Sequence, residues 1–440
     1  VTGTYKGYSL SGITLVSPTV LNVSYYDDYA FMGTNGIPAS TDANFKYDAE
    51  TGYDTRYTTS AKTFLTGTLT AKLEGSSTPS YLCSVMYFDH AGRLTTVKHK
   101  LNTDSIVTLA ENTYDELGRL KTNKKNKQSA LISSYAYNIR SWMKSVASPL
   151  FSQTLYYNDT YAGNTPRYNG NISAMSWSVS GENKTRGYNF TYDNLSRLTG
   201  AGYLENGNAN DRFNTSYAYD KHGNMTLLSR RGNTGTTTYG LIDNLTFTLD
   251  GNKLMRTDDA ATATAYNGGF EFKDAVKQDN EYTYDKNGNM TKDLNKNITD
   301  IQYNCLNSPS KVTFQDDSTI TYTYAVNGTK LRTVHTIGNT TTTTDYCGNV
   351  IYENGVQKLL LTDAGHVTLS DKKYHYYLQD HQGNNRVVVD QTGQKEEVNH
   401  YYPFGGTFAS ADGNVQAYKY NGKELDTKKG LNWYDYGARM

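Results

Sequence analysis

The chain has 440 residues, enough for two or three domains or for one large repetitive structure. Its 43 lysines and arginines equal its 43 aspartates and glutamates in number, so the formal net charge is zero. This balance gives no electrostatic reason to expect a nucleic acid or an anionic membrane as partner, and no run reaches the roughly 18 apolar residues of a membrane-spanning helix.

Tyrosine is the unusual feature of the composition. The chain holds 40 tyrosines, and Tyr, like Thr, favours strands with one packed and one wet side. Seven prolines and 38 glycines argue against a disordered or collagen-like chain. The cysteines Cys83, Cys305 and Cys347 are far apart and odd in number, so we expect no disulfide framework and no cysteine metal site.

Residues 1–80 lack clean repeats but still contain strand patterns. The segments "VLNVSYYDDYAFM" and "TRYTTSAKTFLTGTLTAKLEG" read as strands punctuated by Gly and Asp. We therefore expect this region to be continuous with the sheet that follows it. Because the chain begins at Val1 with neither an initiator methionine nor a signal-peptide pattern, we interpret it as part of a longer protein.

Residues 81–335 repeat one short signature. A Tyr or Phe is followed by Asp, then after two intervening residues by Gly, and after one more by an apolar residue that starts another strand. The good copies are "VMYFDHAGRLTT", "ENTYDELGRLKT", "FTYDNLSRLTG" (with Ser196 in place of Gly), "SYAYDKHGNMTL" and "EYTYDKNGNMTK". Weaker copies lie around Tyr137, Leu249 and Tyr324. Such internal repetition indicates a chain of identical supersecondary units.

Each copy predicts a β-hairpin. The Asp side chain accepts hydrogen bonds from backbone N–H groups about two residues on, and Gly supplies a positive φ in a loop of three to five residues. The predicted turn residues are Asp115, Gly118, Asp220, Gly223, Asp285 and Gly288. Helical periodicity is nearly absent, so the sequence predicts an all-β protein built on an antiparallel sheet.

A sheet of this length must curl or close, because open sheets rarely exceed about ten strands. The plainer interpretation is a β-sandwich or a propeller with a tyrosine-rich surface. The alternative is a sheet that spirals around a cavity.

Residues 336–440 begin with a segment, 336–375, that predicts four strands with turns at Gly348-Asn349, Asn354-Gly355 and Ala364-Gly365. It continues without a Pro- or Ser-rich linker into "YYLQDHQGNNRVVVDQTGQ", "HYYPFGG" and "YKYNGKELDTKKGLNWYDYGARM".

The repeats resemble the YD repeats of bacterial Rhs proteins, which are related to the shells of insecticidal toxin complexes and to the YD shell of teneurins. The C-terminal segments resemble the Rhs repeat-associated core domain. The matching positions include Asp380, Gly383, Arg386, Pro403, Phe404, Gly405, Gly422, Gly430 and Gly437-Ala438-Arg439. The resemblance implies that residues 81–335 wind into a hollow β-cocoon and that residues 336–440 form a core domain, truncated at its C-terminal end, that plugs one end.

In several relatives an aspartyl autoprotease in the core domain releases a C-terminal toxin. The resemblance places Asp426 at the position of a catalytic Asp, but Leu425 stands where cleaving relatives commonly have Arg, which removes a positive charge that helps keep a carboxylate ionised. The chemistry needs a second carboxylate with a water between the two, expected in a segment beyond Arg439. The alternative is that Asp426 is a turn-capping carboxylate before Gly430. We therefore expect this chain itself not to be an enzyme.

Other candidate sites have simpler interpretations. Asp380-His381 suggests a catalytic or metal pair, but neither G-x-S-x-G nor H-E-x-x-H accompanies it. A hairpin turn with positive φ at Gly383 is favoured, and His375 and His400 are interpreted as strand residues. The basic segment 121–127 is interpreted as a solvated loop. The tyrosines suit sugar stacking as well as sheet packing, but their regular placement favours a structural role. We expect no metal and no cofactor.

The resemblance implies a structural function: the shell of an Rhs-type polymorphic toxin that encloses and delivers a C-terminal effector, secreted or at the cell surface, in interbacterial competition. The expected partners are that effector and a cap or delivery protein of a secretion system. A surface-adhesion or glycan-binding role, by analogy with teneurins, is one alternative. Self-cleavage by an aspartyl autoprotease in the full-length protein is the other. A toxin-like sequence after Met440 favours the shell, and a membrane anchor there favours adhesion.

Overall fold

The computed structural model describes residues 3–13, 15–33, 61–73, 79–101, 105–408 and 415–437. These residues form antiparallel strands joined by turns, and the helices among them are single 3-10 turns of three residues each. The prediction of an all-β protein is therefore confirmed. No described helix has the length and apolar character needed to span a bilayer. The chain divides into two compact units, Val1–Tyr135 with Leu360–Val367, and Ala136–Leu359 with Thr368–Met440.

The first unit is a run of consecutively paired strands. It contains β1 (Gly3–Tyr5), β2 (Tyr8–Leu10), β3 (Asn22–Asp27), β4 (Ala61–Lys72), β5 (Ser80–Phe88), β6 (Leu94–Leu101), β7 (Val107–Tyr114), β8 (Leu120–Lys125), the 3-10 turn η1 (Ser129–Leu131) and most of β9 (Ile132–Tyr137). From β3 to β9 each strand pairs antiparallel with the next one along the chain. This is the pairing expected of chained hairpins.

The second unit continues the same pattern over more strands. Its elements are β10 (Met143–Ala147), β11 (Phe151–Tyr156), β12 (Ala174–Val179), β13 (Arg186–Tyr192), β14 (Leu198–Glu205), β15 (Asn208–Ala209), η2 (Asp211–Phe213), β16 (Thr215–Tyr219), β17 (Met225–Asn233), β18 (Tyr239–Asp250), β19 (Lys253–Asp259), η3 (Tyr266–Gly268), β20 (Tyr282–Tyr284), β21 (Met290–Asp293), η4 (Leu294–Lys296), β22 (Ile298–Tyr303), β23 (Pro309–Phe314), β24 (Thr319–Tyr324), β25 (Lys330–Ile337), β26 (Thr340–Cys347), β27 (Val350–Glu353), β30 (Lys373–Gln379), β31 (Asn385–Asp390), β32 (Lys395–Val398), β33 (His400–Tyr401), η5 (Pro403–Gly405), β34 (Thr407–Phe408), η6 (Tyr420–Gly422), β35 (Leu425–Asp426), η7 (Lys428–Gly430) and β36 (Trp433–Tyr434). Strands β28 (Val356–Thr362) and β29 (Gly365–Thr368) belong partly to each unit. Consecutive antiparallel pairing runs from β10 to β15 and from β16 to β19, with β14 also pairing β16, and again from β20 to β27.

The N-terminal region only partly follows the expectation of one continuous sheet. Strands β3 and β4 pair with each other, and β4 pairs with β5, so they join the long sheet. Strands β1 and β2 instead pair with each other in a separate two-stranded sheet. They are only three residues long, and a tyrosine attaches them, since Tyr25 donates its hydroxyl hydrogen bond to the carbonyl of Lys6 at 2.6 Å. Residues 34–60 and 74–78 of this region lie outside the described residues.

The four strands predicted within residues 336–375 are present as β26, β27, β28 and β29. Turns occupy Gly348-Asn349 and Asn354-Gly355, as predicted. The third turn is Asp363-Ala364, one residue earlier than predicted. Gly365 has φ 154° and already belongs to β29, so its backbone is close to extended and does not form the turn.

The repeat turns share one hydrogen-bond arrangement. In the Asp115 turn, one carboxylate oxygen accepts from the backbone N–H groups of Leu117 at 3.0 Å and Arg119 at 2.9 Å. The other oxygen accepts from Arg119 Nε at 2.7 Å. The same arrangement, with Arg or Asn as the last partner, recurs at Asp89, Asp193, Asp220 and Asp285. The values of φ are 76°, 91° and 85° at Gly118, Gly223 and Gly288, the left-handed region that glycine adopts without strain.

The repeat tyrosines connect each hairpin to the one before it. Tyr114 Oη donates to the carbonyl of Leu94 at 2.7 Å. Tyr219 and Tyr284 make the same bond, to the carbonyls of Leu198 and Leu254, both at 2.8 Å. Each acceptor lies at the start of the strand that follows the preceding turn. Tyr at this position therefore supplies a hydroxyl bond between neighbouring repeats, which Phe lacks.

Cations add to this coupling between repeats. The Arg93 guanidinium lies 4.9 Å from the centre of the Tyr114 ring, and Arg197 lies at the same distance from the Tyr219 ring. The arginine belongs to one turn and the tyrosine to the next hairpin. A cation over an aromatic face within about 6 Å is favourable, so the turn side chains also join adjacent units.

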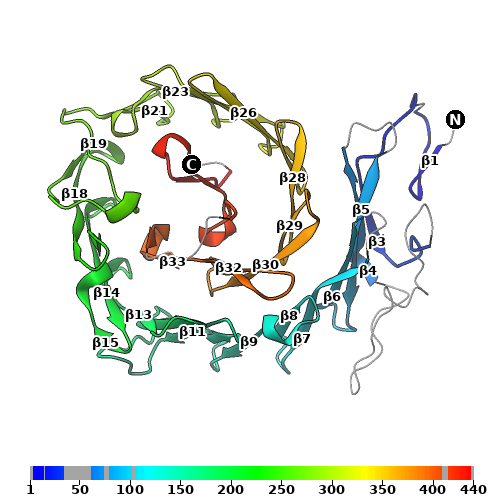
Figure 1. The fold of residues 1–440 in the computed structure, drawn as a ribbon, viewed down its shortest axis with the longest axis horizontal. Helices are drawn as coiled ribbons and strands as arrows, with labels where there is room; N and C mark the ends of the chain where they lie inside the picture. The colour runs from blue at the N-terminus through cyan, green and yellow to red at the C-terminus, as the bar shows by residue number, and fades with distance from the viewer. Residues whose placement is uncertain are drawn as a thin grey trace. The chain divides into compact units, whose positions relative to one another are not determined.

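In the second unit the C-terminal segment contacts strands that are widely separated in sequence. Leu431 is fully buried in a cluster with Ile298, Val312 and Phe314. Hydrogen bonds or ion pairs also join His381 to Gln153, His400 to Trp177, Tyr402 to Arg231, Lys429 to Asp316 and Glu424 to Lys330. Figure 1 shows this segment, in red, among the strands of that unit. These contacts place the predicted core-domain residues against the repeat strands.

Candidate functional site

Two residues of the predicted core-domain signature, Asp380 and Arg386, form a buried ion pair. The Asp380 carboxylate accepts from Arg386 Nε at 2.7 Å, and their side chains are 0% and 2% exposed. The guanidinium lies about 5 Å from the ring centres of Trp177 and Tyr401, at 5.0 and 5.1 Å. Burial alone raises the pKa of Asp380, but the charge of Arg386, then that of His381, and hydrogen bonds lower it by more, so the carboxyl is held ionised.

Asp380 also makes the repeat turn. One of its oxygens accepts from the backbone N–H groups of Gln382 and Asn384, at 3.0 and 3.1 Å, and Gly383 has φ 77°. The hairpin-turn interpretation of "DHQGN" therefore fits the geometry. This turn has the same arrangement as the repeat turns, with Arg386 added to it.

The remaining signature residues shape tight turns. Phe404 and Gly405 have φ of 67° and 100°, and Tyr402 N–H donates to the carbonyl of Gly406 at 2.7 Å across them. A Cβ on Gly405 would lie 2.8 Å from the Tyr420 ring. Positive φ values are also found at Gly422, Gly430 and Gly437. Pro403 starts the 3-10 turn η5. Ala438 and Arg439 lie outside the described residues.

Asp426 lies in β35, which pairs with β36. One of its carboxylate oxygens accepts from the backbone N–H of Lys428 at 3.0 Å, which is the turn-capping contact. The other is 2.7 Å from Nε2 of His335 on β25. Both carboxylate oxygens therefore have a partner. One is bound within its own turn by Lys428, and the other by His335, which is 91 residues away in sequence.

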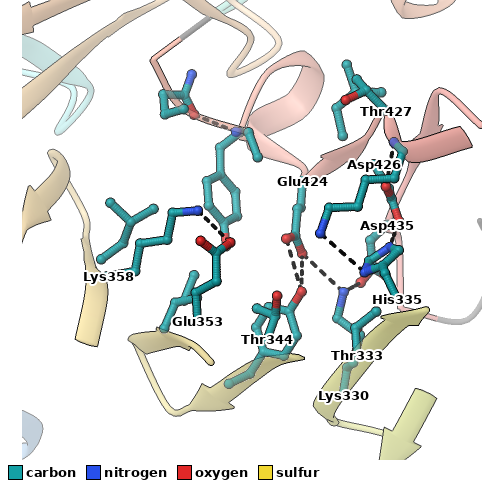
Figure 2. Close-up of a pocket in the computed structure, with 18 of the residues that line it drawn as sticks. Lys330, Thr333, His335, Thr344, Glu353, Lys358, Glu424, Asp426, Thr427 and Asp435 are labelled. Atoms are coloured by element: carbon teal, nitrogen blue, oxygen red, sulfur yellow. Dashed lines mark hydrogen bonds and ion pairs between the residues drawn. The ribbon is translucent and has the colours of Figure 1, made fainter. Parts of the chain in front are cut away.

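A lysine fixes the orientation of His335. Lys428 Nζ lies 3.4 Å from Nδ1 of His335, and a lysine ammonium only donates. Nδ1 therefore accepts, the ring proton is assigned to Nε2, and His335 donates to Asp426. Figure 2 shows His335 and Asp426 side by side at the cavity.

These contacts correct one expectation from the sequence. Leu425 brings no positive charge to Asp426, but His335 and Lys428 supply donors and charge from other positions. Burial alone raises the pKa of Asp426, and the contacts of His335, followed by those of Lys428, lower it by more, so the pKa lies below its ordinary value. The carboxyl is held ionised without the arginine.

A second polar group lies beside the first. Lys330 forms ion pairs with Glu424, at 3.1 Å, and with Asp435. Tyr346 donates to the Glu424 carboxylate, 3.0 and 2.9 Å from its two oxygens. Burial lowers the pKa of Lys330, but the two carboxylates raise it by more, so the lysine stays charged. Burial, followed by the charge of Glu424, raises the pKa of Tyr346, which stays protonated.

Both groups line one cavity of about 310 Å³ in the second unit. Its polar lining includes Lys330, His335, Glu353, Lys358, Glu424, Asp426, Lys428 and Asp435, and its apolar lining includes Ile351, Leu359 and Trp433. Asp426 is therefore not the lone carboxylate of this cavity. Carboxylates beside donors can take part in proton transfer, but Glu424 and Asp435 share a single counter-ion, Lys330, here.

Among the residues that the structure describes, no group of His, Cys, Asp or Glu has the arrangement of a metal site. The residues that sequence reasoning missed are Lys330 and His335, both on β25, and Tyr346 on β26. The segment "LRTVHTIG" gives His335 no distinguishing motif. Only the fold brings it to Asp426.

Comparisons with known proteins give one sequence relative and several structures. No protein-family model matches the chain. Salivary gland surface protein 1 of Aedes aegypti is 27% identical over 196 residues, which is 38% of this chain and 6% of that protein.

Among solved structures, a chain of the Photorhabdus luminescens Tc holotoxin pore matches 84% of this chain with a TM-score of 0.63 and 17% identity. The TcdB2-TccC3 complex matches 85% with a TM-score of 0.62 and 17% identity. The same complex without its hypervariable C-terminal region matches 85% with a TM-score of 0.61 and 16% identity. This chain spans 19–20% of the length of those chains. It therefore has an all-β fold of long antiparallel sheets that matches the shell fold of the Tc toxins.

Proposed function

We propose that this chain is part of the wall of an Rhs-type polymorphic toxin, a hollow β-cocoon that encloses and delivers a C-terminal effector. The observation that carries the proposal is the fold match, which covers 84% of the chain with a TM-score of 0.63 and so takes in repeats and C-terminal region together. In this function the repeats supply a continuous wall, and the spiral of the sheet closes around the cargo. The proposed setting is secretion or display at the cell surface of a bacterium.

The C-terminal region is the proposed plug of that wall. Its residues bind strands from β11 to β26 through contacts such as His381 with Gln153 and Glu424 with Lys330. A plug has to hold several parts of a wall at once, and contacts spread along the sheet suit that task. The proposed partners are an effector continuous with the core domain and a cap or delivery protein.

A protease-protection experiment tests this function. A protease-sensitive reporter peptide is fused after Met440 in one protein and before Val1 in another, and both are digested under native conditions. We expect the C-terminal reporter to survive longer, because it would emerge inside the wall. Electron microscopy of the same proteins should show an internal void. Equal digestion of the two reporters, with a compact particle lacking a void, would refute the container.

Surface adhesion is a second candidate function. The observation that favours it is the 27% identity to a salivary gland surface protein over 196 residues. Binding of the purified chain to a glycan array or to intact cells tests it. Specific binding that is lost when exposed tyrosines such as Tyr168 are replaced would favour adhesion over the container.

Self-cleavage in a longer chain is a third candidate. It is supported by the lowered pKa of Asp426 and by two further carboxylates, Glu424 and Asp435, in the same cavity. The test is to express the chain with its natural continuation, with and without Asp426→Asn. Cleavage that requires Asp426 would make this residue catalytic. An intact extended chain would leave Asp426 as a turn cap that also binds His335.

A further inference from the structure

His400 is a buried residue of the C-terminal region, at the point where this region packs against repeat strands. Its side chain is 0% exposed, and it lies in β33. Trp177 of β12, which is 1% exposed, donates from Nε1 to His400 Nδ1 at 3.0 Å. On the other side of the ring, His400 Nε2 is 3.0 Å from a carboxylate oxygen of Glu182. One imidazole thus joins two residues more than 200 positions away in sequence, the separations being 223 and 218.

This geometry requires a neutral imidazole. The indole N–H of Trp177 is a donor only, so Nδ1 of His400 must offer a lone pair. The ring proton is therefore on Nε2 and is donated to Glu182. A second proton on Nδ1 would face the indole N–H across 3.0 Å. The indole is 1% exposed, so protonation in this geometry replaces a hydrogen bond by two opposed donors.

The charged groups around the ring do not all favour a cation. Glu182 favours it, but its second oxygen already accepts from Arg186 at 2.7 Å. Arg186 on β13 and Arg386 on β31 bring two positive charges near the ring. The Phe408 ring of β34 also lies beside the imidazole, 5.9 Å away between ring centres.

We propose that His400 is an acid-sensitive clasp, which holds β33 against β12 while its imidazole is neutral and releases it when the imidazole is protonated. The clasp is a property of this contact and holds whether or not the chain is the wall of a container. If the chain is such a wall, the clasp would loosen the C-terminal region in an acidic environment and hold it at neutral pH.

The direction of the effect follows from linkage. Burial, the largest cause, lowers the pKa of His400 from 6.5 to about 4, against the hydrogen bond that His400 donates to Glu182, which raises it. The unfolded or released state binds the proton more tightly, so the contact is at full strength above pH 6.5 and weakens as the pH falls towards 4. With these two pKa values, the opening equilibrium of β33 is expected to rise about 30-fold between pH 7.5 and pH 5.0.

Hydrogen exchange of the whole chain tests the clasp. Protection factors of the segment 398–406, corrected for intrinsic exchange, are measured by mass spectrometry at pH 7.5 and pH 5.0. We expect them to fall about 30-fold in the wild type. His400→Gln stays neutral, so its protection should be nearly equal at the two pH values. The matched control is His222→Gln, because the His222 side chain is 80% exposed and should leave the wild-type response unchanged.

A second measurement on the wild type serves if His400→Gln does not fold. Nitrogen NMR of histidine-labelled protein should show His400 with its proton on Nε2 at pH 6, where an ordinary histidine is largely protonated. Titration of His400 near pH 6.5 with unchanged protection of 398–406 would overturn the proposal. A wild-type protein equally protected at both pH values, or a His400→Gln variant that keeps the full pH response, would also overturn it.

Discussion

Tyr219 in one repeat donates its hydroxyl hydrogen bond to the backbone carbonyl of Leu198 in the preceding hairpin, at 2.8 Å. The Asp that follows this tyrosine folds its own turn, while the tyrosine binds the neighbour. The Tyr and the Asp of the repeat thus have different roles: the Asp forms hydrogen bonds within a hairpin, and the Tyr forms one between hairpins. An isolated hairpin is marginal in water, so this bond, like the backbone pairing between hairpins, stabilises each hairpin through its neighbour.

The tyrosine bond can be removed almost alone. We expect Tyr219→Phe to cost about 1 kcal/mol of unfolding free energy, because the ring and its contact with Arg197 remain while the hydroxyl bond is lost. Urea unfolding measures this. Tyr168→Phe is the control, since Tyr168 is 70% exposed and should change stability little. A cost at Tyr168 as large as at Tyr219 would contradict the assigned role.

The turn glycines should be costly to replace for conformational reasons only. A Cβ on Gly288 meets nothing within 4 Å, and φ there is 85°. Gly288→Ala should therefore cost about 1 kcal/mol through backbone strain without any clash. Ser196 occupies the corresponding place in another repeat at φ 61°, so Ser196→Gly should change stability in the opposite direction. Thermal unfolding of both variants checks the pair, and two changes of the same sign would argue against the strain.

Among the signature residues, we expect substitution in the Asp380–Arg386 pair to lower the free energy of unfolding the most. Asp380→Asn leaves Arg386 charged and 2% exposed without its counter-ion. We expect a loss of about 3–5 kcal/mol, since removing one partner of a buried ion pair strands the other. Asp390→Asn is the matched control, because Asp390 caps the same kind of turn, and Asn138 already caps one elsewhere. Equal effects in the two variants would show that the turn, not the ion pair, is what matters.

The ionisation of Asp426 should depend on His335. His335→Leu and Lys428→Met should each raise the pKa of Asp426, because each removes a contact that lowers it. The sign for stability follows: with a lowered folded pKa, the contribution of Asp426 is present above its ordinary pKa of 3.8 and is lost as the pH falls through the folded value. Carboxyl carbon NMR titration measures the pKa directly. Lys358→Met, in the same cavity but paired with Glu353, should leave it unchanged.

The strand-turn-strand unit was predictable because all of its determinants are local. The Asp115 carboxylate accepts from backbone N–H groups only two and four residues ahead. The positive φ of the turn lies at Gly118, and glycine adopts it without strain. Such contacts form within any chain that carries the same ten or so residues, so a repeat pattern is enough to predict them. The turn at Asp363-Ala364 was misplaced by one residue because a glycine can also start a strand.

The sequence by itself determined the all-β class, the hairpin repeat and the residues that cap its turns, because these depend on hydrogen bonds between near neighbours in the chain. Only the tertiary structure decided which of these residues meet at a distance. His335 reaches Asp426 across 91 residues and Trp177 reaches His400 across 223, and neither pair has a spacing that marks it. Their protonation states depend on burial and on neighbouring charges from several strands. These are properties of a packed interior, and no stretch of sequence contains them.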